Sequence, residues 1–279
     1  MDRAGALTPA AKISTMTYTP VVLSFSLASA LLLSACGTST PSSISLPSAS
    51  AQAAADTGQA LRSEPVRWKR DKPGCKRECP RIEVDSLAFP QDEKLTALVD
   101  HALAMMTGLE SNVQPTYLSI AEFEAYYWRT AKPRYAVVLK AELKHQQGPI
   151  TVLTLSSYQF TGGAHGIPAT QYLNWDRGAQ RVLGLADVLE PGRGPQFVQA
   201  LARAHKRWLE DNRDYQDNPT RYAELWPFSP SDNYALAKDG ITVKYDAYAI
   251  APYSHGEPEL TIPYTELTGI LKPAYLPAR

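Results

Sequence analysis

Apolar residues recur at two different spacings along this chain, and the spacing separates helices from strands. Positions 95, 98, 99, 102, 103 and 106 are apolar, which predicts a helix with one buried stripe. Ser119 is followed three residues later by Glu122, the capping-box signature of a second helix. A third helix is expected over residues 196–211, where Phe197, Leu201 and Trp208 share one face.

Alternation with a period of two predicts strands elsewhere: residues 82–86, two strands within 135–160 joined by a turn at 146–149, and a hairpin within 169–189 turned at 176–178. A turn at Asp239-Gly240 leads into a further strand, in which the apolar set changes sides near Ala247. That shift predicts a β-bulge, and another strand begins at Glu259. Helices interleaved with hairpins indicate an α+β fold: an antiparallel β-sheet built from hairpins, with helices packed on one face.

Near the N-terminus lies an uncharged apolar run from about Val21 to Leu33, which ends in Leu33-Ser-Ala-Cys36. It is shorter than the roughly 20 residues that span a bilayer and has the length of a secretory signal. Its end resembles the bacterial lipobox, in which the cysteine is lipidated. The alternative is an ordinary secretory signal followed by an unpaired cysteine, and the true start, Met1 or Met16, stays open.

The lipobox resemblance implies a lipoprotein signal peptide over residues 1–35 and a lipid anchor in the membrane through Cys36. Glycine and threonine follow Cys36 instead of aspartate, which implies the outer membrane, facing the periplasm. Residues 36–65 are rich in Ser, Pro and Ala and are expected to form a flexible tether. The folded domain is then expected over 66–273, with a strand-helix-helix part over 66–134 and a hairpin-rich part over 135–273.

Charge and cysteine content narrow the function classes. The chain has 28 basic and 28 acidic residues, a balance that excludes the basic footprint of a nucleic-acid-binding protein. Cys75 and Cys79 form an even pair in an oxidising compartment, which predicts a disulfide. A zinc site is the alternative, but it needs further ligands nearby, and the sequence offers none.

A search for catalytic motifs finds neither a G-x-S-x-G elbow nor an H-E-x-x-H pair. We therefore expect no cofactor, no metal and no catalytic residue. The segment "TGGAHGIP" is the main candidate for chemistry, because three glycines surround His165. Gly162 and Gly163 allow a tight turn, so His165 is expected to brace a neighbouring loop; ligand contact or general-base catalysis are the alternatives.

Two segments, "YQFTGGAHGIPATQYLNWD" and "KDGITVKYDAYAIAPYSHGEPELTIPY", together resemble the RsiV-type extracytoplasmic domain. The best-known domain of that family belongs to a transmembrane anti-sigma factor that binds lysozyme, and related domains precede peptidoglycan deacetylase modules. The resemblance implies a mixed α/β fold. This chain has a lipobox where the sensor has a cytoplasmic segment, so anti-sigma activity is not expected here.

The resemblance implies noncatalytic binding of an extracytoplasmic protein, with lysozyme as the candidate partner and inhibition or decoy as the role. The alternative is a peptidoglycan-directed enzyme or a glycan-binding accessory module that uses His165. The loop "APYSHGEP" is the expected recognition element, because it is constrained and carries an aromatic ring. The expected binding residues are Pro252, Tyr253, Ser254, His255, Pro258 and His165, and the expected structural glycines are Gly162, Gly163, Gly166, Gly240 and Gly256.

Overall fold

The computed structural model describes residues 60–108 and 115–277. The expected signal peptide, the lipidation site at Cys36 and all but the last residues of the expected tether lie outside this part. The described residues form an α+β fold, as the sequence predicts. Within the expected tether, Leu61 is buried in a hydrophobic core, and its backbone N–H donates to Gln146 Oε1 at 2.6 Å.

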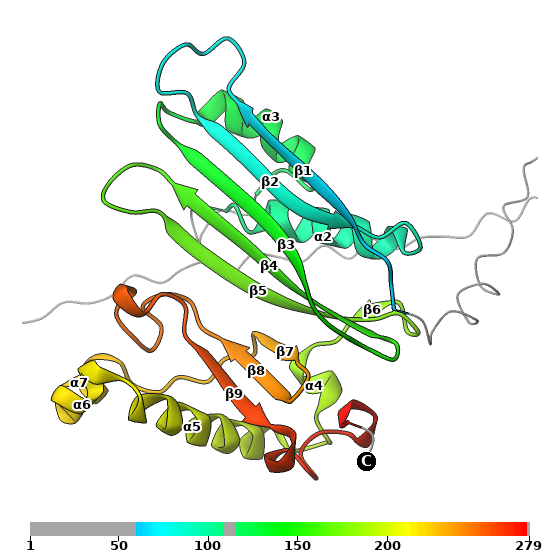
Figure 1. The fold of residues 1–279 in the computed structure, drawn as a ribbon, viewed down its shortest axis with the longest axis vertical. Helices are drawn as coiled ribbons and strands as arrows, with labels where there is room; N and C mark the ends of the chain where they lie inside the picture. Colours follow the sequence, from blue (N-terminus) through cyan, green and yellow to red (C-terminus); the bar gives the residue numbers. More distant parts are fainter. Residues whose placement is uncertain (1–59, 109–114, 278–279) are drawn as a thin grey trace, which may run out of the picture. The chain divides into compact units, whose positions relative to one another are not determined.

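Six strands form a mixed sheet in the order β1-β2-β3-β4-β5-β6 (Figure 1). All neighbouring pairs are antiparallel except β2 and β3, which run parallel. The prediction of an antiparallel sheet therefore misses one pair, because the chain returns through two helices between β2 and β3. The strands are β1 (Glu64–Asp71), β2 (Arg81–Ala88), β3 (Ala136–Gln147), β4 (Ile150–Phe160), β5 (Ile167–Asp176) and β6 (Arg181–Val182).

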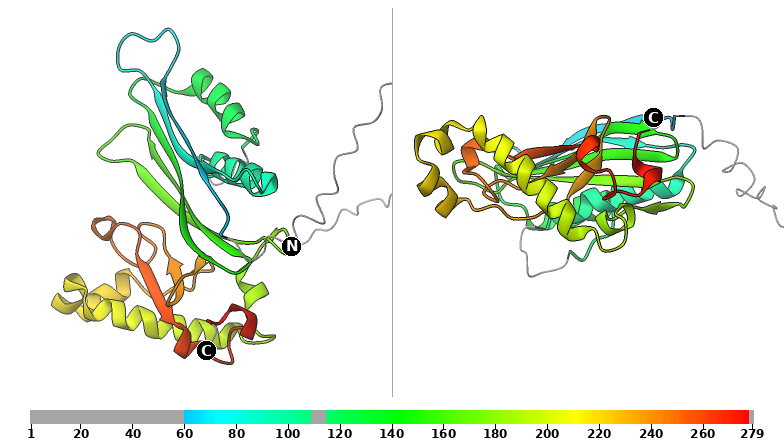
Figure 2. Two further views of the ribbon diagram at one scale, coloured as in Figure 1. Left: turned by 45° about the vertical axis from the view of Figure 1, so that its right-hand side comes forward. Right: turned by 90° about the horizontal axis from the view of Figure 1, so that it is seen from below.

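Helices α2 (Glu93–Met105) and α3 (Ile120–Thr130) cover one face of this sheet (Figures 1 and 2). Asp92 caps α2 by accepting the Leu95 N–H at 2.9 Å, and Ser119 caps α3 by accepting the Glu122 N–H at 3.2 Å. We call the apolar interior between these helices and the sheet the N-terminal core. Its fully buried members include Ile82, Phe89, Leu95, Leu103, Leu139, Leu153 and Trp175.

A second sheet of three antiparallel strands has the order β7 (Tyr234–Leu236), β8 (Gly240–Lys244) and β9 (Glu259–Pro263). Helix α5 (Gly194–Glu210) packs against it and forms the C-terminal core. Gly240 allows β8 to approach β9, since a Cβ atom there would collide with the Ile262 carbonyl. The shorter elements are α4 (Leu185–Val188), α6 (Arg213–Asp217), α7 (Pro219–Leu225) and single 3₁₀ turns at Tyr253–His255, Tyr264–Glu266 and Pro273–Tyr275.

The expected β-bulge near Ala247 is not present. Strand β8 ends at Lys244, and the Ala249 N–H donates to the Asp246 carbonyl at 3.1 Å in a turn. Tyr248 takes the left-handed region with φ 70°, which is uncommon for an aromatic residue. The change of side in the apolar pattern thus marks a turn that raises Tyr248 out of the sheet, leaving its side chain 53% exposed.

Two asparagine side chains join the sheets by replacing backbone groups. Asn174 of β5 donates from Nδ2 to the Tyr234 carbonyl at 2.7 Å, and its Oδ1 accepts the Leu236 N–H at 2.8 Å. Asn233, just before β7, makes the reciprocal pair of bonds to β5. Its Oδ1 accepts the Tyr172 N–H at 2.8 Å, and its Nδ2 donates to the Thr170 carbonyl at 2.7 Å. The two amides thereby pair the edge of β5 with the start of the second sheet.

Candidate functional site

The two segments singled out in the sequence meet in the fold. The loop between β4 and β5 presents His165, whose ring stacks on Tyr253 with the centroids 3.9 Å apart and the planes 21° from parallel. The Tyr253 hydroxyl donates to the Gly166 carbonyl at 3.0 Å. The ring stack and this hydrogen bond hold the loop against the 3₁₀ turn that carries Tyr253.

Glycines shape this loop. Gly162 and Gly163 have φ values of 98° and 90°, a region that other residues enter only with strain. Gly166 has a different role: its N–H donates to the Tyr158 hydroxyl at 2.9 Å, and a Cβ atom would collide with the Tyr158 ring. The glycines therefore turn the chain so that His165 reaches Tyr253.

His165 is exposed, and its Nδ1 lies 3.0 Å from the Gly166 carbonyl oxygen. Within residues 60–108 and 115–277, no carboxylate or hydroxyl is hydrogen-bonded to this ring. A general base is usually oriented by such a group, whereas the contact observed for this ring is its stack on Tyr253. Nowhere in the described part of the chain do three or more His, Cys, Asp or Glu side chains gather as metal ligands would.

The other expected binding residues separate. His255 turns toward α6, with its Nε2 2.8 Å from Asp214 Oδ2. Ser254 is exposed, Pro258 is buried, and Pro252 borders a small hollow beside Trp226. Of the residues expected in the "APYSHGEP" loop, only Tyr253 lies with His165. The remaining glycine of this loop, Gly256, ends the 3₁₀ turn with φ 65°.

His165 and Tyr253 border a cleft of about 400 Å³ between the β4–β5 loop and the turn after β8. Of the described residues that line it, Asp246 is the only Asp, Glu, Lys or Arg, and its carboxylate has no hydrogen-bond or ion-pair partner among the described residues. Ile167 and Tyr248 are 60% and 53% exposed at this cleft. We call His165, Ile167, Asp246, Tyr248 and Tyr253 the loop surface.

Three of these five residues were not predicted from the sequence: Ile167, Asp246 and Tyr248. The break in alternation at Ala247 was the available signal for Tyr248, because a side chain that leaves a strand pattern is free to face solvent. Tyr248 also approaches Tyr253, with ring centroids 5.5 Å apart, and stacks on Trp226 at 6.3 Å. The loop surface thus continues an aromatic row that spans three segments of the chain.

A cluster of charged side chains links strands of the two sheets. Glu259 accepts from the Tyr172 hydroxyl at 2.7 Å and lies 3.3 Å from Lys144 Nζ and 3.6 Å from Lys244 Nζ. Burial opposes ionisation of Glu259, but the Tyr172 hydrogen bond and the two lysines outweigh it and lower the pKa of the carboxyl group. Burial, with Glu259 adding to it, raises the pKa of Tyr172 well above its ordinary value. These contacts join β3, β5, β8 and β9.

Cys75 and Cys79 form a disulfide at the tip of the β1–β2 hairpin, with Cα atoms 5.6 Å apart. The prediction of this bond from the cysteine pair is confirmed. Among the residues described, none of the helices is both long and apolar enough to span a bilayer.

Comparisons with known proteins place the fold in a family. Residues 186–265 match the family described as "Protein of unknown function (DUF3298)". A crystal structure of a DUF3298 family protein from Pseudomonas aeruginosa PAO1 is 38% identical, covers 80% of this chain and 100% of that chain, and has a TM-score of 0.73. A DUF3298 family member from Bacteroides fragilis NCTC 9343 shares the fold at 21% identity, over 77% of this chain and 95% of that one, with a TM-score of 0.60.

A characterised relative is the peptidoglycan-N-acetylmuramic acid deacetylase PdaC of Bacillus subtilis (strain 168). It is 23% identical over 137 residues, which are 48% of this chain and 29% of that enzyme. The chain therefore spans less than a third of PdaC. The full-length match to the Pseudomonas protein decides the family: the chain belongs to the DUF3298 family.

Proposed function

We propose that this protein is a noncatalytic recognition protein of the bacterial cell envelope that binds a basic extracytoplasmic protein through the loop surface. The observation that carries the proposal is the pair of rings formed by the exposed Tyr248 and the half-buried Tyr253, beside the Asp246 carboxylate, which has no partner among the described residues. Tyrosine is enriched at the centres of protein interfaces, because it combines large contact area with little side-chain entropy.

The chemistry of the loop surface favours a cationic side chain. In the part of the chain that the structure describes, no lysine or arginine lines the cleft, so the charge of Asp246 is available to a partner. An arginine or lysine placed there would pair with the carboxylate and lie against the faces of the tyrosine rings. Lysozyme is a strongly basic protein, and the RsiV-type resemblance of the same two segments supports it as the partner, with inhibition or decoy as the role.

The test is to titrate the purified full chain with lysozymes of several classes and to measure complex formation and muramidase activity together. We expect a complex at micromolar concentration. Tyr248→Ala should weaken it at least about tenfold, since an interface anchor contributes roughly 2 kcal/mol. Asp246→Asn should weaken it less and reduce its dependence on salt. Leu118→Ala is the matched control, because Leu118 is 63% exposed and does not line the cleft.

Absence of a complex with every lysozyme class at these concentrations would exclude lysozyme as the partner. Equal affinities for the wild type, Tyr248→Ala and Asp246→Asn would show that any complex forms elsewhere. The first result tests the identity of the partner, and the second tests the position of the binding surface.

A lipid anchor at Cys36 is part of the proposal, with the outer membrane as its place and the folded domain in the periplasm. Cys36→Ala should then release the protein from the membrane fraction into the soluble fraction of the envelope. Unchanged partitioning of the variant would refute lipidation.

A second candidate follows from the match to PdaC: a peptidoglycan-directed enzyme or glycan-binding accessory module that uses His165. Its test is turnover of purified peptidoglycan by the full chain. Turnover that disappears in His165→Ala, with the fold intact by circular dichroism, would favour catalysis over the recognition function.

A further inference from the structure

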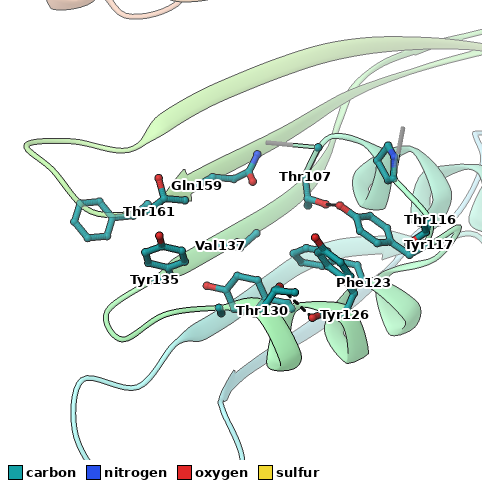
Figure 3. A pocket seen from close by; sticks show the side chains of 15 residues that line it. Thr107, Thr116, Tyr117, Phe123, Tyr126, Thr130, Tyr135, Val137, Gln159 and Thr161 are labelled. Atoms are coloured by element: carbon teal, nitrogen blue, oxygen red, sulfur yellow. Dashed lines mark hydrogen bonds between the residues drawn. The ribbon is translucent and has the colours of Figure 1, made fainter. Parts of the chain in front are cut away.

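A second cavity, distinct from the cleft at the loop surface, opens at the edge of the N-terminal core. It has a volume of about 300 Å³ and lies between α3 and the ends of β3 and β4. Figure 3 shows Tyr135 and Thr161 at one end of the cavity and Tyr117 and Thr116 at the other, with Tyr126 and Thr130 of α3 facing Gln159 of β4. The volume is at the lower end for small-molecule sites.

Six aromatic residues line the cavity. Tyr117 lies 5.2 Å from Phe123 and 5.3 Å from Tyr126, and Phe123 lies 5.5 Å from Tyr127, measured between ring centroids. Tyr135 and Phe160 add two more rings. Tyr126 is 39% exposed, so its ring is accessible from solvent at the mouth of the cavity.

Among the described residues that line the cavity, none is Asp, Glu, Lys, Arg or His. A charged ligand would lose its hydration there without gaining a counter-charge, which is strongly unfavourable. A neutral ligand carries no such penalty. The composition of the wall therefore selects against ions and zwitterions.

Hydrogen-bonding groups are placed between the rings. The hydroxyls of Thr116, Thr130 and Thr161 are at the exposed rim, and the Gln159 amide is in the wall, where its Nε2 donates to the Met106 carbonyl at 3.2 Å. The Tyr127 hydroxyl is buried in the same wall and has no partner among the described residues. Unsatisfied buried hydroxyls are unfavourable, so a ligand that supplied a partner would be stabilised.

We propose that this cavity binds a neutral saccharide ring, with an N-acetylhexosamine as the class that fits best. A sugar presents C–H faces to aromatic rings and hydroxyls around its edge, which matches a wall of rings interrupted by threonine hydroxyls and an amide. The acetamido group adds a methyl for the aromatic wall and a carbonyl acceptor for a hydroxyl donor. A purely aliphatic ligand would leave these polar groups without partners.

The test is calorimetry and saturation-transfer NMR on the purified full chain with N-acetylglucosamine and its trimer. We expect saturable binding with a dissociation constant on the order of 1 mM for the monomer, as is usual for a small neutral ligand. Glucosamine and glucuronic acid, which are charged, should bind at least about tenfold more weakly, because neither charge finds a partner.

Tyr126→Ala should raise the dissociation constant for the trimer about tenfold, by removing the exposed ring at the mouth. Tyr135→Phe keeps the ring and removes one hydroxyl, so it reports on hydrogen bonding with little risk to the fold. Tyr248→Ala is the matched control: it removes a similarly exposed tyrosine from the loop surface and should leave sugar affinity unchanged. Thermal unfolding of each variant verifies the fold.

The proposal is overturned if neither sugar binds, if charged and neutral sugars bind equally, or if Tyr248→Ala weakens binding as much as Tyr126→Ala. Saturable binding of a neutral aromatic such as indole without any sugar binding would also overturn it. Because the loop surface has its own variants and its own partner, either proposal can fail while the other stands.

Discussion

The two hydrophobic cores differ in the side chains that their covering helices contribute. Over the six-stranded sheet, α3 contributes aromatic rings that contact one another and leave an uncharged cavity at their edge. Over the three-stranded sheet, α5 inserts Phe197, Ala200 and Leu201, which are all at most 1% exposed. The family match over residues 186–265 contains the second arrangement, and the residues that line the cavity lie outside it.

This difference shows that the two proposed sites depend on their cores in different ways. The loop surface consists of loop and turn segments that lie outside the C-terminal core. The cavity is part of the N-terminal core, because the same rings close the core and line the space. Mutations should therefore disturb the loop surface with little loss of stability, whereas mutations at the cavity should affect stability and binding together.

The largest expected effect comes from breaking the junction between the cores. Asn174 is 1% exposed, and Asn174→Ala removes two hydrogen bonds and leaves the Leu236 N–H and the Tyr234 carbonyl without them. We expect the free energy of unfolding to fall by about 3 kcal/mol. Denaturant unfolding followed by fluorescence measures it.

Asn233→Ala is the comparison variant, since Asn233 makes the reciprocal pair of bonds from a half-buried position. Its loss should be about half as large, because water can reach the groups it releases. Equal and negligible losses in the two variants would show that the amides do not join the sheets.

A smaller effect is expected from the disulfide, which tests the N-terminal half alone. Replacing both Cys75 and Cys79 by serine removes a crosslink that closes a short loop at the end of β1 and β2. The loop-entropy estimate for such a short loop is about 2 kcal/mol of stability. Thermal unfolding of the wild type with and without a reductant also compares the protein with and without the disulfide. An unchanged melting temperature would contradict the predicted stabilisation.

Among the described residues, the buried polar groups without a partner include the Tyr127 hydroxyl on α3, in the N-terminal core, and His205 Nε2 on α5, in the C-terminal core. Tyr127→Phe removes the hydroxyl and retains the ring, so the free energy of unfolding should rise by about 1 kcal/mol or less. Urea unfolding measures the change. A clear loss of stability would mean that the hydroxyl has a partner in solution.

The smallest effect is a dependence on pH confined to the C-terminal core. Burial lowers the pKa of His205 from its ordinary value of 6.5. The unfolded chain therefore takes up a proton before the folded protein does, and stability falls as the pH drops below about 6.5 and levels off below the folded pKa.

The measurement is the urea midpoint of the wild type and of His205→Phe between about pH 7.5 and pH 5. Phenylalanine keeps an aromatic ring against Trp208 and Phe228, which His205 contacts with centroids 6.0 Å and 5.5 Å away. The difference between the two proteins isolates His205 from other titrating groups. Parallel pH profiles would refute the assignment.

Local patterns were enough to predict much of the fold. Spacing located α2, Ser119 and Glu122 located the start of α3, and alternation located β3 and β4, because each signal acts within a few residues. No local sequence signal predicts the parallel pairing of β2 and β3, because this pairing depends on how the two helices between them pack. Strand β1 was also missed, because its sequence EPVRWKRD is mostly charged.

The candidate sites were predictable only in part. "TGGAHGIP" and Tyr253 were recognised separately, but the stack of His165 on Tyr253 joins residues that are far apart in the chain. The cavity in the N-terminal core depends on Tyr126 and Tyr135, which a pattern of apolar residues treats as ordinary core or boundary positions. The lack of charge among its described lining residues could not be predicted, because these residues come from separate segments of the chain that meet only in the fold.

The asparagine junction also has a consequence for association between copies. An open strand edge offers unpaired N–H and C=O groups to a strand of another molecule, and such pairing starts aggregation. On β5 the Tyr172 N–H and the Thr170 carbonyl are already occupied by Asn233. At the opposite edge, β1 carries Arg67, Lys69 and Arg70, whose charges disfavour an incoming strand. The charged edge strand β1 and the part of β5 that β6 does not cover are thus both less open to strand addition when copies are crowded together.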